Sequence, residues 1–174
     1  MTTKPTKRTA RLGALVATLV IAAIGAACGG PQPAAGPAQG GGGCGGPGGP
    51  PDATTSAIYN ATNASRGGAG LGPLSWDPQL YCLASGWSQE MGNSNSMFHR
   101  DLGAALRSPG YGGYGTLGEN VLVGPSDMSG GAMHSAWMNS PEHRANILSG
   151  AFGSFAVATY HANGSVWVTE NFGG

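Results

Sequence analysis

AWMNSPEHRANIL, residues 136–148, says more about the fold than any other stretch of the chain. A helix is expected to end near Asn139, because the residue before a proline is pushed out of helical geometry and Ser140 precedes Pro141. Pro141 can then occupy the first position of a second, short helix. That helix would hold His143 on a fixed backbone, with Ile147 and Leu148 anchoring it to a core.

The first 27 residues have the pattern of a secretory signal peptide. Four basic residues precede an almost wholly apolar run from Leu12 to Ala27, which is shorter than the roughly 20 residues needed to span a membrane. Small residues stand directly before Cys28, which leaves two outcomes open. The chain is cut after Ala27 and secreted, or Cys28 is lipidated and becomes the first residue of a bacterial lipoprotein, held at the membrane only by its lipid.

Residues 28–51 are dominated by Gly, Pro, Ala and Gln and are predicted to form a flexible tether. Residues 52–174 are then one domain of ordinary size. Without the signal peptide, the chain has four arginines, no lysine and eight Asp and Glu residues, so its net charge is negative. Nucleic acid is therefore an unsuitable partner, because phosphate binding needs clustered cations.

The three cysteines fit an exported chain in one simple way. If Cys28 carries lipid, Cys44 and Cys82 are left to form a disulfide that pins the tether to the domain. The alternative is that Cys82 is a buried, small apolar residue on a helix.

Periodicity and turn residues predict helices before strands. Apolar spacing predicts helices over 53–65, 78–91 and 129–138, the second being broken by 92–96. Strands are expected at 155–160 and 166–172, joined by a turn at Asn163-Gly164. This order indicates an α+β fold with helices packed on an antiparallel sheet.

Five motifs occur together in a fixed order. They are Leu71-Gly-Pro-Leu-Ser-Trp-Asp-Pro78, His99, Gly118-Glu119-Asn120, Trp137-Met-Asn-Ser-Pro-Glu-His-Arg-Ala-Asn-Ile-Leu148 and Trp167-Val-Thr-Glu-Asn-Phe-Gly173. With them the chain resembles the bacterial branch of the CAP superfamily, the SCP-like extracellular proteins. The resemblance implies export and a three-layer α-β-α sandwich of the CAP type with a central antiparallel sheet.

The resemblance also implies a cleft lined by two histidines and acidic residues. His99, Glu119 and His143 match three of its positions. The fourth position, an acid in eukaryotic-type members, is Ser140 here. Glu142 and Glu170 are the candidates for an additional acid in the cleft.

Two chemical interpretations of the cleft remain open. A divalent metal such as zinc could bind His99 and His143 with Glu119 nearby and water in an open position, or the three side chains could form a hydrogen-bonded polar cluster without metal. A hydrolase would use a histidine as general base and Glu119 as its orienting group. No nucleophile elbow and no His-Glu-x-x-His motif is present in the sequence, so no catalytic residue is assigned and we favour binding.

The ligand is expected to be a lipid or sterol-like molecule, or a partner on a cell surface, as the resemblance implies. Methionines could line an apolar groove for such a lipid, although we favour ordinary core packing as the reason for them. These methionines are Met91, Met97, Met128, Met133 and Met138. The function expected is thus an exported cell-envelope protein that binds a ligand, with metal-assisted hydrolysis in the same cleft as the alternative.

Overall fold

The computed structural model describes the backbone of residues 15–21 and the whole of residues 45–174. The predicted lipidation site Cys28 and the predicted disulfide partner Cys44 lie outside these residues. Most of the predicted tether does so as well.

The described residues form five helices and five strands. The helices are α1 (Ala53–Gly68), α2 (Pro78–Ser94), α3 (Leu102–Leu106), α4 (Gly130–Met138) and α5 (Pro141–Ile147), and the strands are β1 (Leu15–Ile21), β2 (Ser75–Trp76), β3 (Leu117–Pro125), β4 (Ser154–Ala162) and β5 (Ser165–Gly173).

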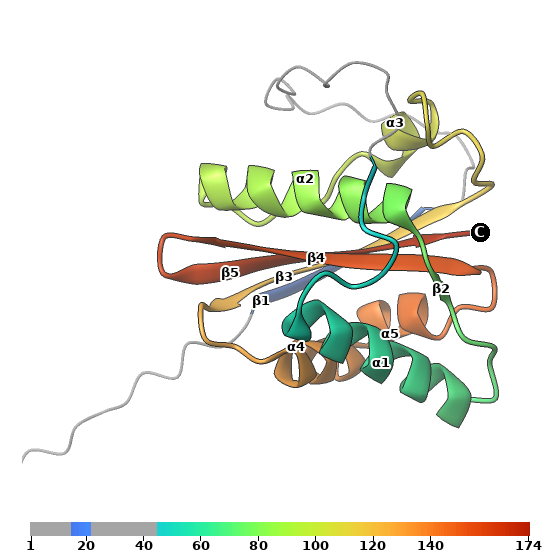
Figure 1. Cartoon of the computed structure of the whole chain (residues 1–174), viewed down its shortest axis with the longest axis horizontal. Coiled ribbons are helices and arrows are strands. Elements are labelled where there is room, and N and C mark those ends of the chain that lie inside the picture. Colours follow the sequence, from blue (N-terminus) through green and yellow to red (C-terminus); the bar gives the residue numbers. More distant parts are fainter. Residues whose placement is uncertain (1–14, 22–44) are drawn as a thin grey trace, which may run out of the picture.

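One sheet divides the molecule into three layers (Figure 1). Its strand order is β1-β3-β5-β4-β2, and all neighbours are antiparallel except the short β2, which runs parallel to β4. Helices α2 and α3 lie on one face, and α1, α4 and α5 lie on the other (Figure 1). The predicted α-β-α sandwich with a central antiparallel sheet is confirmed.

The helix boundaries follow from local sequence signals. Asp52 and Asp77 cap α1 and α2 by accepting hydrogen bonds from backbone N–H groups of the first turn. Pro141 opens α5 as predicted. The helix predicted to run to Met91 continues to Ser94 and ends at Asn95 in the left-handed conformation, within the predicted break at 92–96.

Gly92 lies inside α2 for a packing reason. A Cβ at this position would lie 2.8 Å from a ring carbon of Tyr160 and 3.1 Å from Trp167, closer than side chains pack. The glycine therefore lets the helix approach the sheet and does not end it.

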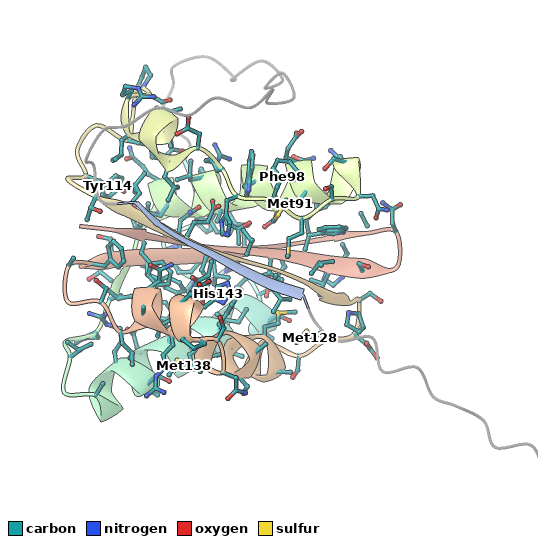
Figure 2. All side chains as sticks on the ribbon, turned by 180° about the vertical axis from the view of Figure 1, so that it is seen from behind. Met91, Phe98, Tyr114, Met128, Met138 and His143 are labelled. Carbon is teal, nitrogen blue, oxygen red and sulfur yellow. The ribbon has the colours of Figure 1, made fainter. Side chains whose placement is uncertain are left out.

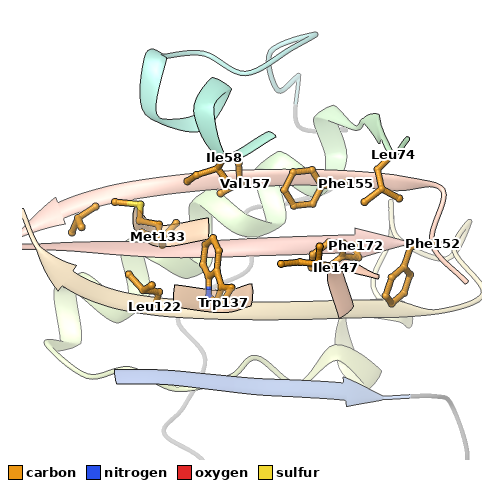
Figure 3. Packing of buried hydrophobic residues seen from close by; sticks show 12 residues of the cluster. Ile58, Leu74, Leu122, Met133, Trp137, Ile147, Phe152, Phe155, Val157 and Phe172 are labelled. Atoms are coloured by element: carbon orange, nitrogen blue, oxygen red, sulfur yellow. The ribbon is translucent and has the colours of Figure 1, made fainter. Parts of the chain in front are cut away.

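The main core lies between the sheet and the layer of α1, α4 and α5 (Figure 3). Trp137 is fully buried there, and its indole N–H donates to the carbonyl of Val121, which ties α4 to β3. Leu122 of β3 points into this core, whereas Leu117 and Val121 pack on the α2 side. This alternation sets the face on which each polar residue of β3 lies.

The N-terminal part of the chain contributes to the domain in two places. Residues 15–21, in the apolar run of the predicted signal peptide, form β1 along the outer edge of β3. Residues 45–51, predicted as the end of the tether, lie against the domain: the Trp76 indole donates to the carbonyl of Pro47 over 2.8 Å. None of the described helices is long and apolar enough to cross a membrane.

Arg66 offers a test of how α1 is held. Its buried guanidinium donates to the carbonyls of Gly72, Ile147 and Ser149. Replacement of Arg66 by Ala leaves these carbonyls without their donor and is expected to lower the free energy of unfolding by roughly 2–4 kcal/mol, measured by urea denaturation. The exposed Arg107→Ala is the control and should change it by less than about 0.5 kcal/mol.

Candidate functional site

The same dipeptide, Glu-Asn, occurs on two neighbouring strands. Glu119-Asn120 lies on β3 and Glu170-Asn171 lies on β5. The antiparallel register places Glu119 opposite Asn171 and Asn120 opposite Glu170. Because successive side chains of a strand point to opposite faces, one Glu-Asn pair lies on each side of the sheet.

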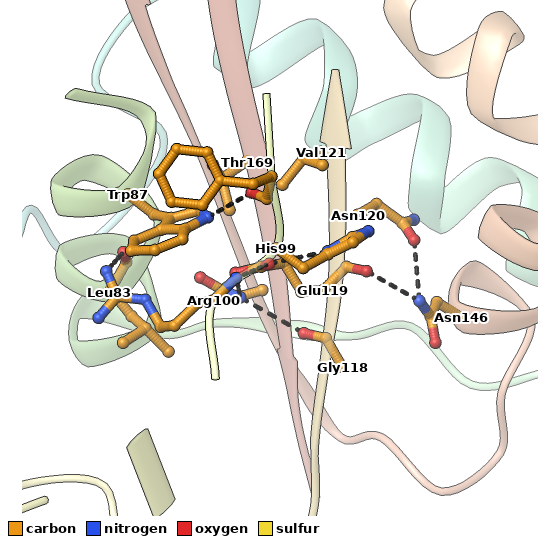
Figure 4. Close-up of polar contacts among 12 residues, drawn as sticks. Leu83, Trp87, His99, Arg100, Gly118, Glu119, Asn120, Val121, Asn146 and Thr169 are labelled. Carbon is orange, nitrogen blue, oxygen red and sulfur yellow. Dashed lines mark hydrogen bonds and ion pairs between the residues drawn. The ribbon is translucent and has the colours of Figure 1, made fainter. Parts of the chain in front are cut away.

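The pair on the α2 side is built around Glu119, which is fully buried. Its Oε2 accepts from the amide of Asn171 over 3.3 Å. Its Oε1 accepts from the backbone N–H of Arg100 and from Nδ1 of His99, each over 3.0 Å (Figure 4). Nδ1 of His99 must be the donor here, because a carboxylate oxygen is the acceptor. Both oxygens of Glu119 are thus engaged.

The loop that carries His99 is fixed from both ends. The Trp87 indole of α2 donates to the carbonyl of Phe98 over 2.9 Å, and the two rings meet edge to face. The Arg100 guanidinium lies 4.6 Å from the centre of the Trp87 ring and donates to the carbonyl of Leu83. Burial lowers the pKa of Arg100, and the charge of Glu119 opposes that shift. His99 is therefore a positioned side chain.

The pair on the other face joins β3 to α5. The amide nitrogen of Asn120 donates to Oε2 of Glu170 over 2.9 Å and to the carbonyl of His143 over 3.3 Å. Asn146, one turn further along α5, donates to the side-chain oxygen of Asn120 and to the carbonyl of Glu119. All of these side chains are buried, so the start of α5 is held on β3 by a buried amide network.

Glu170 is a buried acid whose pKa lies well above its ordinary value. Burial raises its pKa to about 8, although hydrogen bonds from Asn120 and Thr62 oppose the shift. Thr62 also lies 3.4 Å from Nδ1 of His134, whose Nε2 lies 2.9 Å from the hydroxyl of Ser65. His134 is therefore a hydrogen-bonded residue between α1 and α4.

The predicted site residues are placed as follows. His99 and Glu119 are in direct contact. His143 is buried on α5 (Figure 2) and comes to β3 from the opposite face of the sheet. Glu170 lies on that opposite face, away from Glu119, and Glu142 is exposed in the first turn of α5. Glu170 and Glu142 thus do not join His99 and Glu119.

The described residues contain no group of three His, Cys, Asp or Glu side chains placed to hold one metal ion. Glu119 accepts three hydrogen bonds, two at Oε1 and one at Oε2, and serves to orient His99. Metal binding by His99 and His143 stays a prediction.

Two serines precede His143 in the sequence, and Cys82 lies on α2. The hydroxyl of Ser135 donates to the carbonyl of Gly131, and Ser140 precedes α5 without a side-chain cap. Cys82 is disulfide-bonded, so the alternative of a free buried thiol is wrong. A Cβ on Gly46 would lie 3.2 Å from the Cys82 sulfur, which places the chain just after Cys44 beside it. The Cys44–Cys82 pairing stays a prediction.

All five methionines considered for a groove contact the core clusters, two of them fully buried and three half-buried. Met91 and Met133 are fully buried, and Met97, Met128 and Met138 pack against the core clusters (Figure 2). Core packing, one of the two explanations left open by the sequence, accounts for all five.

Comparison with known proteins now places the chain. Residues 59–172 match the model of the CAP family, the cysteine-rich secretory protein family. The chain belongs to this family. It is 34% identical over 127 residues to the uncharacterized protein YkwD of Bacillus subtilis, covering 67% of this chain and 46% of that protein. It is 24% identical to pathogenesis-related protein 1 of Arabidopsis thaliana, covering 56% of this chain and 55% of that protein.

A solved structure shares the domain. An extracellular protein of Bacillus anthracis that contains an SCP domain is 31% identical with a TM-score of 0.59, covering 68% of this chain and 39% of that chain. The chain thus spans about half the length of the curated relatives it matches.

Sequence reasoning did not single out four residues of the polar network. Asn171, Asn146 and Thr62 act through amides and a hydroxyl, which carry no metal or catalytic signature, and Arg100 acts partly through its backbone. The repeated Glu-Asn dipeptide was the available signal, because two such dipeptides on neighbouring antiparallel strands can pair with each other.

Glu170 predicts how stability depends on pH. Its pKa is raised from 4.5 to about 8 in the folded protein, so the folded state binds the proton more tightly. This contribution to stability is complete below about pH 4.5 and is lost as the pH rises through 8. Glu170→Gln should flatten the decline between pH 5 and 8, removing a slope of at most about 1.4 kcal/mol per pH unit.

Urea unfolding at pH 5, 6, 7 and 8 measures this slope. The exposed Glu142→Gln is the matched control and should keep the wild-type slope. An unchanged slope in Glu170→Gln would show that Glu170 is ionised in the folded protein across this range.

Proposed function

We propose that this CAP-domain protein is exported and binds a ligand at the site formed by His99 and Glu119 on the α2 side of β3. One observation carries the proposal. Glu119 fixes the His99 ring through Nδ1, and Nε2 at the other end of the ring is buried with no hydrogen-bond partner among the described residues. Such atoms are rare in folded proteins and need a partner.

The charge at this site favours an uncharged polar group. Glu119 and Arg100 are neighbours of opposite charge, so the site has no excess of either sign to attract an ion. A hydroxyl or an amide can hydrogen-bond to Nε2 without a charge to compensate. The core placement of the methionines gives less support to a lipid or sterol-like ligand than to a partner protein on a cell surface.

Export is supported by the family and by the relative of B. anthracis that is described as extracellular. The sequence before the domain has the pattern of a signal peptide followed by Cys28. We therefore propose attachment to the cell envelope through lipid on Cys28, with the chain secreted if that residue is not modified.

The alternative of metal-assisted hydrolysis has less support. Glu119 accepts three hydrogen bonds and serves as an orienting group for His99. A general base would still be available at Nε2 of His99, but no group of three His, Cys, Asp or Glu side chains among the described residues is placed to hold a metal ion beside it.

Binding to the envelope of the producing cell tests the site. The labelled secreted chain carrying Cys28→Ser, which has no lipid, is sedimented with envelopes. His99→Ala removes one hydrogen bond and should weaken binding roughly tenfold, whereas the exposed His161→Ala should bind as the parent chain does. Equal binding by all three chains would rule the site out.

Treatment of the envelopes separates the partner classes. Protease should abolish binding if the partner is a protein, and solvent extraction should abolish it if the partner is a lipid. Time-dependent release of envelope fragments by the parent chain, lost in His99→Ala, would instead establish the hydrolase.

Lipidation has its own test. Wild type should partition into the detergent phase of a Triton X-114 separation, and Cys28→Ala should stay in the aqueous phase, because an acyl chain contributes about 0.8 kcal/mol per buried methylene. Recovery of both in the aqueous phase would show that Cys28 carries no lipid.

A further inference from the structure

The outer edge of β3 accepts an added strand in this structure. The segment Leu15–Ile21 pairs with Leu117–Val123 of β3 in an unbroken antiparallel register of seven residues. Among the described residues, β1 is the outermost strand at this end of the sheet. The added strand is therefore held by backbone pairing along β3, together with contacts to the elements on either side of that edge.

This edge passes directly through the candidate site. Leu19 is the partner of Glu119, whose side chain holds His99, and Thr18 is the partner of Asn120, which holds the carbonyl of His143. Helix α5 also contacts β1. An occupant of the edge therefore lies between the loop of His99 on one face of the sheet and α5 on the other.

The occupant seen here belongs to the proposed signal peptide, which cleavage during export would remove. If residues 1–27 are cleaved as proposed, β3 loses its outer partner and its outward N–H and C=O groups become unpaired. An open edge strand of this kind is a template for another strand. Within Leu117–Val123, charge is confined to Glu119, which is buried and satisfied by protein donors, so the edge offers no ionic contact.

We propose that the outer edge of β3 binds an extended, uncharged apolar segment of a partner protein as an added antiparallel strand, and that residues 15–21 hold this place until the signal peptide is removed. The inference rests on the proposed export and deepens the proposed binding site by naming its ligand class, a peptide strand. Main-chain hydrogen bonds to β3 would provide affinity, as in other cases of strand addition.

A synthetic peptide of the sequence LVATLVI, with lysines added outside it for solubility, is the probe. The processed chain carrying Cys28→Ser should bind it, with amide shifts in the ¹H–¹⁵N spectrum concentrated in residues 117–123 and in α5. The full-length chain that retains residues 15–21 should bind it at least about tenfold more weakly, because its own strand occupies the edge. Equal binding by the two chains would overturn the proposal.

Two N-methylated peptides test backbone pairing. An edge strand uses only the N–H groups of alternate residues toward its neighbour. One peptide is methylated at the positions of Leu15, Ala17 and Leu19, and the other at those of Val16, Thr18 and Val20. One of them should lose binding about tenfold or more and the other should keep it. The same behaviour of both peptides would exclude an edge-strand interaction.

The remaining outcomes separate this inference from the proposed function. If the processed chain sediments as a dimer that the peptide does not dissociate, the edge serves a second copy and the proposal is wrong. If the peptide does not bind while His99→Ala still weakens envelope binding, the site is retained and its ligand is not a strand. If the peptide binds and His99→Ala has no effect on envelope binding, the edge is retained and the proposed role of His99 fails.

Discussion

The interior of this domain depends on satisfying two acidic side chains that have no access to water. An ionised or protonated carboxyl in a protein interior is tolerated only when hydrogen bonds replace those of water. Glu119 and Glu170 meet this constraint with the asparagine opposite each of them, Asn171 and Asn120. Every part of the candidate site is attached to one of these two pairs: the loop of His99 to the first and the start of α5 to the second.

The fold was largely predictable because its signals are local. Proline and aspartate at helix starts, the Asn163-Gly164 turn and apolar periodicity depend on near neighbours in the chain, and α2, α5 and the β4–β5 hairpin formed where these signals indicated. The end of α2 was predicted too early, at Met91, because Gly92 serves close packing against Tyr160 of the sheet and does not end the helix. The pairing of residues 15–21 with β3 likewise depends on residues far apart in the sequence.

The site was predictable only as a set of residues. Motif resemblance identified His99 and Glu119, which the structure joins at 3.0 Å. It gave no face of the sheet, so Glu170 was considered for the same site although the register of β5 directs it to the other side. The donors that satisfy the acids were missed because asparagine has no distinctive chemistry until its partner is known.

The repeated Glu-Asn dipeptide also bears on how the sheet finds its alignment during folding. In the native register each acid meets an amide. A slip of β5 by one residue in one direction would bury Glu119 against Glu170, and a slip in the other direction would place Asn120 against Asn171 and leave both acids without their amide. A misaligned sheet is thus destabilised by buried carboxyl groups that lack their hydrogen-bond donors. The other residues of β3 and β5 are mostly apolar, so they would discriminate only weakly between registers. The repeated dipeptide therefore favours the native register of β3 and β5 over neighbouring registers.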